Sequence, residues 1–269
     1  MKRGKKIVAT LCSTALVATM FMMAGCGNES KPSADNSAAN GDKPSAQKYI
    51  IATDTTFAPF EFENAQGEYV GIDVDILAAV AADQGFEYEL QPLGFDAALQ
   101  SLTSGQADGV IAGMSITEER EKIFDFSAPY FDSGVVMGIS ATDDTIKSYS
   151  DLTGKTVAVK NGTEGEAFAQ SIAEQYGFTL VNFKDSAMMY EDVKAGNSQA
   201  CFEDYPVLGY AITQNVGLQI VTDKERGSSY GFAVKKGENA ELLAAFDAGL
   251  ANIKANGTYQ AILDTYIQK

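Results

Sequence analysis

The chain has 269 residues with 36 acidic and 20 basic side chains, and its sequence contains no histidine. The formal net charge of −16 argues against nucleic acid and anionic lipid surfaces as partners, because both are negatively charged. The lack of histidine excludes histidine-dependent catalytic triads and the usual zinc sites. We therefore expect neither a metal nor a cofactor.

The first 25 residues have the pattern of an export signal. Residues 1–6 are basic, residues 7–24 form an apolar run, and Gly25 and Cys26 follow. The end of this run resembles the lipobox of bacterial lipoproteins, although Met23 stands where leucine is usual. We expect residues 1–25 to be a lipoprotein signal peptide and Cys26 to be lipidated. The alternative is an ordinary cleaved signal followed by an incidental cysteine.

Cleavage after residue 25 would remove four basic residues and move the formal net charge from −16 to −20. With Cys12 removed and Cys26 modified, Cys201 would be the remaining free cysteine, so the mature chain would form no internal disulfide. Residues 26–47 are rich in small and polar residues, which predicts a flexible tether. The tether would hold a body of roughly 220 residues, enough for a core of its own, at the outer face of the cytoplasmic membrane.

From residue 49 onward, strand-like and helix-like segments alternate. The first series has an apolar run at 49–53, a helix rich in Ala and Leu at 74–82, and an alternating run at 86–90. The second series has strands at 156–159 and 179–183 with a helix at 165–176 between them. This rhythm predicts α/β units.

Arg120 lies at an unusual place for a cation. Thr117 is a predicted helix N-cap, so Arg120 takes the third helical position, where the macrodipole is positive and a glutamate is usual. This position suits an arginine if an anion docks against its guanidinium and the free N–H groups of the turn. The alternative is a surface ion pair with Glu119 or Asp125.

Two helix–glycine–strand units correspond between the halves of the chain. In each half a helix ends at a glycine, Gly105 or Gly196, and a strand opens three residues later. The fifth residue after each strand opening is Gly113 in the first half and Asp204 in the second. Both are predicted at the carboxyl end of a strand, where open α/β sheets bind ligands. We therefore expect two lobes that face a shared cleft.

The extended stretches 130–140 and 229–235 are the predicted crossings between these lobes. The second lobe, residues 134–230, would then be an insertion in the first. The first lobe would comprise residues 48–133 and 231–269, completed by helices at 240–255 and 259–267. Two such crossings form a hinge that allows the lobes to close around a ligand.

Five motifs follow one another along the chain: DTTFAPFEF at 54–62, GIDVD at 71–75, AGMSITEER at 112–120, FDFSAPY at 124–130 and NGTY at 256–259. Together they resemble family 3 of the extracellular solute-binding proteins, the polar amino-acid receptors of ABC importers. The resemblance covers residues 49–268 and is nearest to the glutamine-binding proteins. It implies a two-lobed α/β fold of the periplasmic-binding-protein type (type II), with the ligand cleft between lobes joined by two hinge strands.

The same resemblance implies how the backbone groups of an amino-acid ligand are bound. Arg120 would grip the α-carboxylate, with help from the backbone at Ser115. Gly113 and Ser115 would bind part of the α-ammonium, and Asp204 would pair with its charge. Fixed opposite charges of this kind are what a buried zwitterion needs.

For the ligand side chain, the resemblance implies an aromatic pair, Phe57 and Phe95, whose alternative role is ordinary core packing. Asp54 and Lys160 match the polar pair that glutamine receptors direct at the distal amide. An amide both donates and accepts hydrogen bonds, so a carboxylate and an ammonium satisfy it. Lys160 argues against a basic ligand by charge repulsion, and Asp54 argues against glutamate in the same way.

Two positions depart from the family pattern. Relatives bind the α-carboxylate with a backbone N–H in the segment that holds Thr163 and Glu164, and they commonly carry Thr, Ser or Gly at the second position. A carboxylate at Glu164 would oppose an anionic ligand group unless it points outward. Glu203 stands where a glutamine-binding protein has histidine.

We therefore predict a monomeric, lipid-anchored receptor that captures a polar L-amino acid, glutamine, by lobe closure and delivers it to an ABC permease and its ATPase. One alternative is a receptor for a basic or other polar amino acid. Another is a cyclic-acid dehydratase of the same fold, with Glu164 and Glu203 as general acid and base. A third is a sensor that binds the same ligand but passes it to no transporter.

Overall fold

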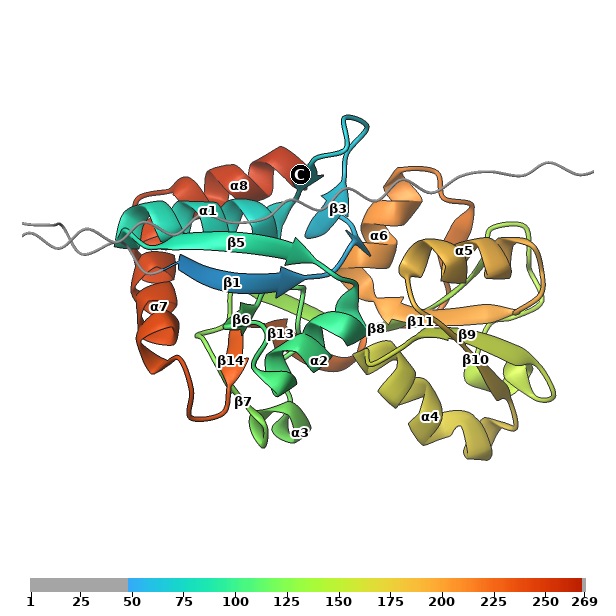
Figure 1. The fold of residues 1–269 in the computed structure, drawn as a ribbon. Coiled ribbons are helices and arrows are strands. Elements are labelled where there is room, and N and C mark those ends of the chain that lie inside the picture. The colour runs from blue at the N-terminus through green and yellow to red at the C-terminus, as the bar shows by residue number, and fades with distance from the viewer. Residues whose placement is uncertain (1–47, 268–269) are drawn as a thin grey trace, which may run out of the picture. The chain divides into compact units, whose positions relative to one another are not determined.

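The computed structural model describes residues 48–267 (Figure 1). The predicted signal peptide, the tether and Cys26 lie outside the described residues, as do Gln268 and Lys269. Within the described part of the chain, no helix is both long and apolar enough to cross a bilayer.

The first lobe is built on a five-stranded sheet. Its strand order is β5 (Glu87–Pro92), β1 (Lys48–Thr53), β6 (Gly109–Val110), β14 (Ala233–Lys235) and β7 (Phe124–Phe126). β1 runs parallel to β5 and β6, and the crossovers between them are helices α1 (Ile72–Gln84) and α2 (Phe95–Ser104). The predicted strand and helix at 49–53 and 74–82 are confirmed. β6 is shorter than predicted, so Gly113 lies three residues beyond its end.

The second lobe is built on a six-stranded sheet. Its order is β10 (Thr179–Phe183), β9 (Thr156–Lys160), β11 (Ala200–Asp204), β8 (Phe131–Ser140) and β12 (Leu218–Ile220), with β13 (Glu225–Tyr230) also paired to β8. Three helices, α4 (Glu164–Tyr176), α5 (Ser186–Lys194) and α6 (Tyr205–Thr213), pack on this sheet, and a 3-10 turn covers Tyr149–Leu152. Figure 1 shows α4 and α5 on opposite sides of it. The elements predicted at 156–159, 165–176 and 179–183 are confirmed.

The C-terminal helices return to the first lobe. α7 (Ala240–Ala255) and α8 (Thr258–Tyr266) pack against α1, as Figure 1 shows. Phe246 and Leu250 of α7 are buried in one apolar cluster with Ile51 of β1 and Ile76 of α1. Burial of this apolar surface is the main stabilising term that joins the end of the chain to its first strand.

A pair of antiparallel strands joins the two lobes. β8 and β13 lie side by side, with Phe131 opposite Tyr230, and the Tyr130 N–H donates to the Tyr230 carbonyl at 2.9 Å. β8 follows β7 of the first sheet, and β13 leads into β14 of the same sheet. The chain therefore crosses between the lobes twice along one ladder, which is the geometry of a hinge.

A small three-stranded sheet, β2 (Thr56–Phe57), β3 (Glu61–Glu63) and β4 (Tyr69–Val70), connects β1 to α1. Gly71 ends this sheet and caps α1 with a φ of 137° and a ψ of 175°, a region that is essentially limited to glycine. A Cβ at this position would lie 2.1 Å from the Phe60 carbonyl oxygen. The neighbouring N–H groups of Ile72 and Asp73 donate to the carbonyls of Pro59 and Phe60, both at 2.9 Å, so the backbone has little freedom to move away.

We therefore expect Gly71→Ala to lower the free energy of unfolding by about 2 kcal/mol or more, because it combines backbone strain with a clash against a fixed carbonyl. Urea denaturation measures the change. Gly209→Ala in the interior of α6 is the matched control: a Cβ there meets nothing within 4 Å, so it should stabilise the protein by about 0.5–1 kcal/mol. Equal midpoints for the two variants would contradict the proposed strain at Gly71.

Candidate ligand-binding site

A narrow cavity of ≈10 Å³ lies between the lobes, near the carboxyl ends of β1, β9 and β11. Its lining residues are Phe57, Phe95, Gly113, Ser115, Arg120, Lys160, Thr163, Glu164 and Asp204. The structure thus brings together nine of the ten residues predicted from the sequence, and the tenth, Asp54, is bonded to Lys160. This volume is about that of a single water molecule, so the lining residues are packed closely together and a larger ligand would enter only if the lobes move apart.

Arg120 contacts both lobes at one end of the cavity. Its Nη1 donates to the Ser115 carbonyl at 2.8 Å, and its Nη2 donates to the Gly162 carbonyl of the second lobe at 3.0 Å. The guanidinium carbon lies 5.3 Å from the centre of the Phe95 ring. Burial lowers the pKa of Arg120, and the nearby carboxylates of Glu164 and Asp204 oppose that shift. The group stays cationic at neutral pH.

The local structure corrects one part of the sequence argument. The predicted N-cap is confirmed, since the Thr117 hydroxyl accepts a hydrogen bond from the Arg120 N–H at 3.2 Å. The helix that follows, α3 (Glu118–Glu121), has only four residues, so its macrodipole is small and Arg120 is no misplaced charge. The predicted alternative partners are engaged elsewhere: Glu119 pairs with Lys122 at 2.6 Å, and Asp125 pairs with Lys236 at 2.7 Å. A surface ion pair is therefore wrong for Arg120.

Asp204 provides the buried acid of the cavity. It is the last residue of β11, as predicted, and its Oδ2 accepts a hydrogen bond from the Tyr230 hydroxyl at 2.6 Å. The same hydroxyl accepts a bond from Ser133 at 3.0 Å, which fixes its direction. Burial, with the charge of Glu203, raises the pKa of Asp204 to about 7, although Tyr230 and Arg120 act against the shift. An ammonium group beside Asp204 would favour its ionised form.

Two backbone positions complete this region. Gly113 has a φ of 52°, its N–H donates to Asp73 at 2.7 Å, and an added Cβ would lie 2.3 Å from the Phe57 ring. Ser115 is buried and pairs with Tyr230 in an isolated β-bridge. With the Gly113 N–H already bonded, its carbonyl is the group that suits an ammonium donor.

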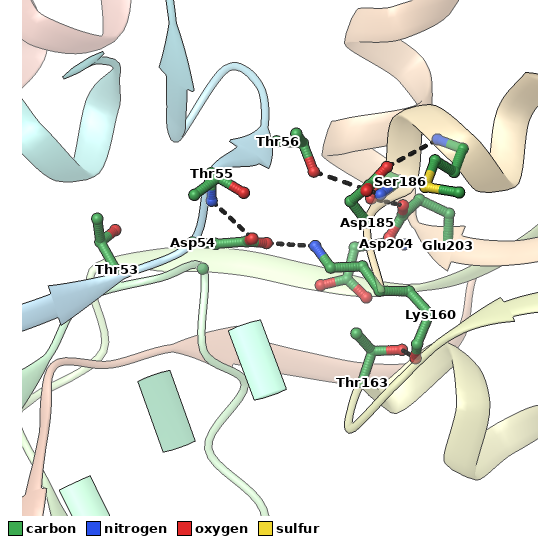
Figure 2. A network of polar contacts seen from close by, with 12 residues as sticks. Thr53, Asp54, Thr55, Thr56, Lys160, Thr163, Asp185, Ser186, Glu203 and Asp204 are labelled. Carbon is green, nitrogen blue, oxygen red and sulfur yellow. Dashed lines mark hydrogen bonds and ion pairs between the residues drawn. The ribbon is translucent and has the colours of Figure 1, made fainter. Parts of the chain in front are cut away.

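Asp54 and Lys160 meet across the cleft at the other side of the cavity (Figure 2). Both are fully buried, and their side chains form an ion pair. The second Asp54 oxygen accepts from the Thr55 N–H at 2.6 Å, and the Lys160 ammonium lies 4.6 Å from the centre of the Phe57 ring. Burial alone would lower the pKa of Lys160, but Asp54 and Glu203 outweigh it and raise the pKa. The cleft therefore holds a charged pair with one member from each lobe.

Phe57 and Phe95 combine core packing with a position at the cavity. Each is 4% exposed and packs in an apolar cluster of the first lobe, and each also lines the cavity. Core packing and a place in the candidate site are thus compatible, because each ring has two faces.

A family model described as bacterial extracellular solute-binding proteins, family 3, matches residues 49–269. The chain belongs to this family. Arginine-binding protein 1 of an Escherichia coli ABC transporter is 32% identical over 226 residues, which cover 82% of this chain and 91% of that protein. The family and these relatives are solute-binding proteins rather than enzymes, so the dehydratase alternative is wrong.

Solved structures extend the comparison. Substrate binding domain 2 of GlnP from Lactococcus lactis, in an open conformation, is 44% identical, with 84% of this chain and 97% of that domain covered and a TM-score of 0.59. An ancestral arginine-binding protein, solved with glutamine and also with arginine, is 37% identical, with 82% and 98% covered and a TM-score of 0.76. This family 3 protein thus resembles ligand-bound relatives more than an open one of higher identity, which indicates closed lobes.

The two departures from the family pattern occupy different environments. Thr163 caps α4 by accepting from the Glu166 N–H at 3.2 Å, and Glu164, the first residue of that helix, lines the cavity. Glu203 is turned into the second lobe, where it accepts from the Ser186 hydroxyl at 2.8 Å and the Tyr190 hydroxyl at 3.1 Å. Burial raises the pKa of Glu203, while Lys160 and these donors favour its charged form.

Sequence reasoning gave no role to three buried groups around the site. Tyr230 lies on the hinge and orients Asp204. Asp73, with a pKa raised to about 6 by burial, accepts from the Gly113 N–H and the Tyr130 hydroxyl, both at 2.7 Å. Beside it, burial and the charge of Asp73 hold the pKa of Glu61 well above its ordinary value. The sequence contains one indication of these groups: two acids, Glu61 and Asp73, stand within two of the motifs quoted above.

The raised pKa of Asp204 predicts a pH-dependent stability for the ligand-free protein. An acid whose pKa rises from 3.8 to about 7 on folding binds a proton in the native state, so stability falls as pH increases between these values. Asp204→Asn removes this term. Relative to the wild type, it should gain about 1–3 kcal/mol between pH 4 and pH 7.

Urea denaturation at several pH values measures this difference. Asp144→Asn, at an exposed acid of the same lobe, should follow the wild-type profile. Parallel profiles for Asp204→Asn and the wild type would show that Asp204 ionises as it does in water.

Proposed function

We propose that this protein is the substrate receptor of an ABC importer and that it binds a polar L-amino acid, glutamine, between its lobes. The observation that carries the proposal is the lining of the cavity between the lobes, which brings together a cation, Arg120, and a buried acid, Asp204. A zwitterion needs opposite charges at a fixed separation in a site that excludes water.

Closure follows from contacts that one ligand makes with both lobes. Arg120, Ser115, Phe57 and Asp54 belong to the first lobe, and Lys160 and Asp204 belong to the second. A ligand bound by both sets has a higher affinity for the closed form than for the open one, and only such a difference shifts the equilibrium. The permease would then recognise the surface that the closed, ligand-bound form presents.

The pair of Asp54 and Lys160 favours glutamine as the ligand. The distal amide of glutamine would donate to the Asp54 carboxylate and accept from the Lys160 ammonium, so that all three groups have hydrogen-bond partners. A glutamate side chain would be repelled by Asp54, and a basic side chain would have to displace Lys160 from its partner. The ancestral relative solved with glutamine supports the same ligand.

Arginine is the second candidate, and one observation favours it. Around the cavity three acids, Asp54, Glu164 and Asp204, face two cations, Arg120 and Lys160, so the site has one excess negative charge when every group is ionised. A cationic ligand would reduce that excess. The ancestral relative solved with arginine and the Escherichia coli arginine-binding protein point the same way.

We propose the following organisation for the rest of the chain. Residues 1–25 are a lipoprotein signal peptide, 26–47 a tether, 48–133 with 231–269 the first lobe, and 134–230 the second lobe. The protein acts as a monomer, anchored through Cys26 at the outer face of the cytoplasmic membrane and working with a permease and its ATPase. The extracellular family and the relatives described as periplasmic support an extracytoplasmic place.

A thermal-shift panel of the twenty amino acids tests the ligand. At about a hundred times its dissociation constant, a ligand adds about 2.7 kcal/mol of stability, which is readily measured. We expect the largest response to L-glutamine and no response from Arg120→Ala, which should still unfold cooperatively without ligand, although the loss of two hydrogen bonds lowers its thermal midpoint. A response to L-arginine alone would select the second candidate. No response to any amino acid would defeat the proposal.

Cell fractionation tests the anchor. Replacing Cys26 with Ser should move the protein from the membrane pellet to the soluble extracytoplasmic fraction, because a signal without the acceptor thiol leaves no lipid attached. Cys12→Ser, within the removed segment, is the matched control and should leave the protein in the pellet. Equal pelleting of all three proteins would mean that Cys26 carries no anchor.

A further inference from the structure

Glu164 places a negative charge beside the group that would bind the ligand carboxylate. It begins α4, lines the same cavity as Arg120, and its side chain is 16% exposed. Its charge acts on Arg120, whose pKa is lowered by burial and raised in part by Glu164. Left alone, this carboxylate would compete with a ligand carboxylate for the same guanidinium.

Arg226 of β13 lies over Glu164 and follows one face of α4. Its Nη1 is 3.8 Å from a Glu164 oxygen, its guanidinium carbon is 5.5 Å from the centre of the Phe168 ring, and its Nη2 donates to the Ser171 hydroxyl at 3.1 Å. Positions 164, 168 and 171 are spaced by four and three residues, so they share a single face of the helix. Three contacts hold the guanidinium on this face, whereas an ordinary surface arginine is free to rotate.

The backbone at Arg226 is itself unusual. Its φ is 43°, in the left-handed region, and an irregularity in the β13 ladder lies between Glu225 and Ser228. Among residues 48–267, the other non-glycine residues with positive φ are Asn215 and Asn239, a residue type that tolerates this region. The backbone of an arginine is strained in this region, whereas that of an asparagine is not. The strain points to a requirement for the arginine side chain at position 226.

We propose that Arg226 is a positioning residue for ligand binding: it holds and neutralises Glu164, so that Arg120 stays available to the carboxylate of the ligand. This inference rests on the proposed function as an amino-acid receptor. It accounts for a glutamate in a segment where a neutral residue would be expected. Glu164 and Arg226 act as one neutral unit at the edge of the cavity.

A double-mutant cycle tests the unit by calorimetric titration of the mature protein with L-glutamine, or with L-arginine if the thermal-shift panel selects it. Arg226→Ala should weaken binding by about three- to tenfold, because Glu164 is then unopposed. Glu164→Gln should bind as tightly as the wild type or more tightly. In the Glu164→Gln background, Arg226→Ala should change the affinity by less than about twofold.

Three controls separate charge from structure. Arg226→Lys keeps the cation and should retain most of the affinity. Lys224→Ala removes an exposed cation two residues away and should have no effect. Thermal unfolding without ligand should be alike in all variants, since the contacts are partly exposed.

The outcomes are distinct. If the wild type binds no amino acid, the proposed function fails. If the wild type binds but Arg226→Ala leaves the affinity unchanged, the inference about Arg226 is overturned and the receptor function stands. The same conclusion follows if Arg226→Ala weakens binding by the same factor in the wild type and in the Glu164→Gln background.

Discussion

The ion pair between Asp54 and Lys160 is the interaction on which the closed form of this protein depends. Asp54 follows β1 in the first lobe, Lys160 ends β9 in the second, and both side chains are withdrawn from water. A buried charge without a partner is strongly destabilising, typically by about 3–5 kcal/mol, whereas the intact pair is nearly balanced against its desolvation. Each lobe therefore provides the group that makes burial of the other tolerable. Separation of the lobes returns both groups to water.

This dependence explains the layout of the rest of the cleft. The Thr55 N–H and the Phe57 ring support the two charges, and Arg120 bonds to carbonyls of both lobes at the other end. Tyr230, on the hinge, holds Asp204 by a hydrogen bond. The hinge and the two ends of the cavity are thus linked by short polar contacts, so that closure aligns them together. Such alignment before binding reduces the entropy lost when a ligand is captured.

Much of the fold follows from local sequence, because the α/β rhythm and the terminating glycines are local signals. α2 ends at Gly105, which adopts the left-handed conformation that the glycine allows. The cavity residues could also be predicted from the sequence, since strand ends and family motifs mark them. The length of α3 could not be predicted, because a capping residue marks where a helix begins but not how far tertiary packing lets it run.

The roles of Tyr230 and Arg226 could not be predicted from the sequence for another reason. Their partners, Asp204 and Glu164, lie 26 and 62 residues away in the chain and approach only when β13 folds onto the second sheet. Contacts at that separation leave no periodic pattern in the sequence. They depend on strand register, which shifts irregularly between Glu225 and Ser228.

The return of α7 and α8 to the first lobe has a mechanical consequence. β1, the first described strand, and α8, the last described helix, pack in one apolar cluster, while the second sheet is reached through the hinge ladder. A force applied at either end of residues 48–267 is therefore borne by the first lobe. The second lobe is joined to the first through the hinge ladder, so neither end of the described residues lies within it.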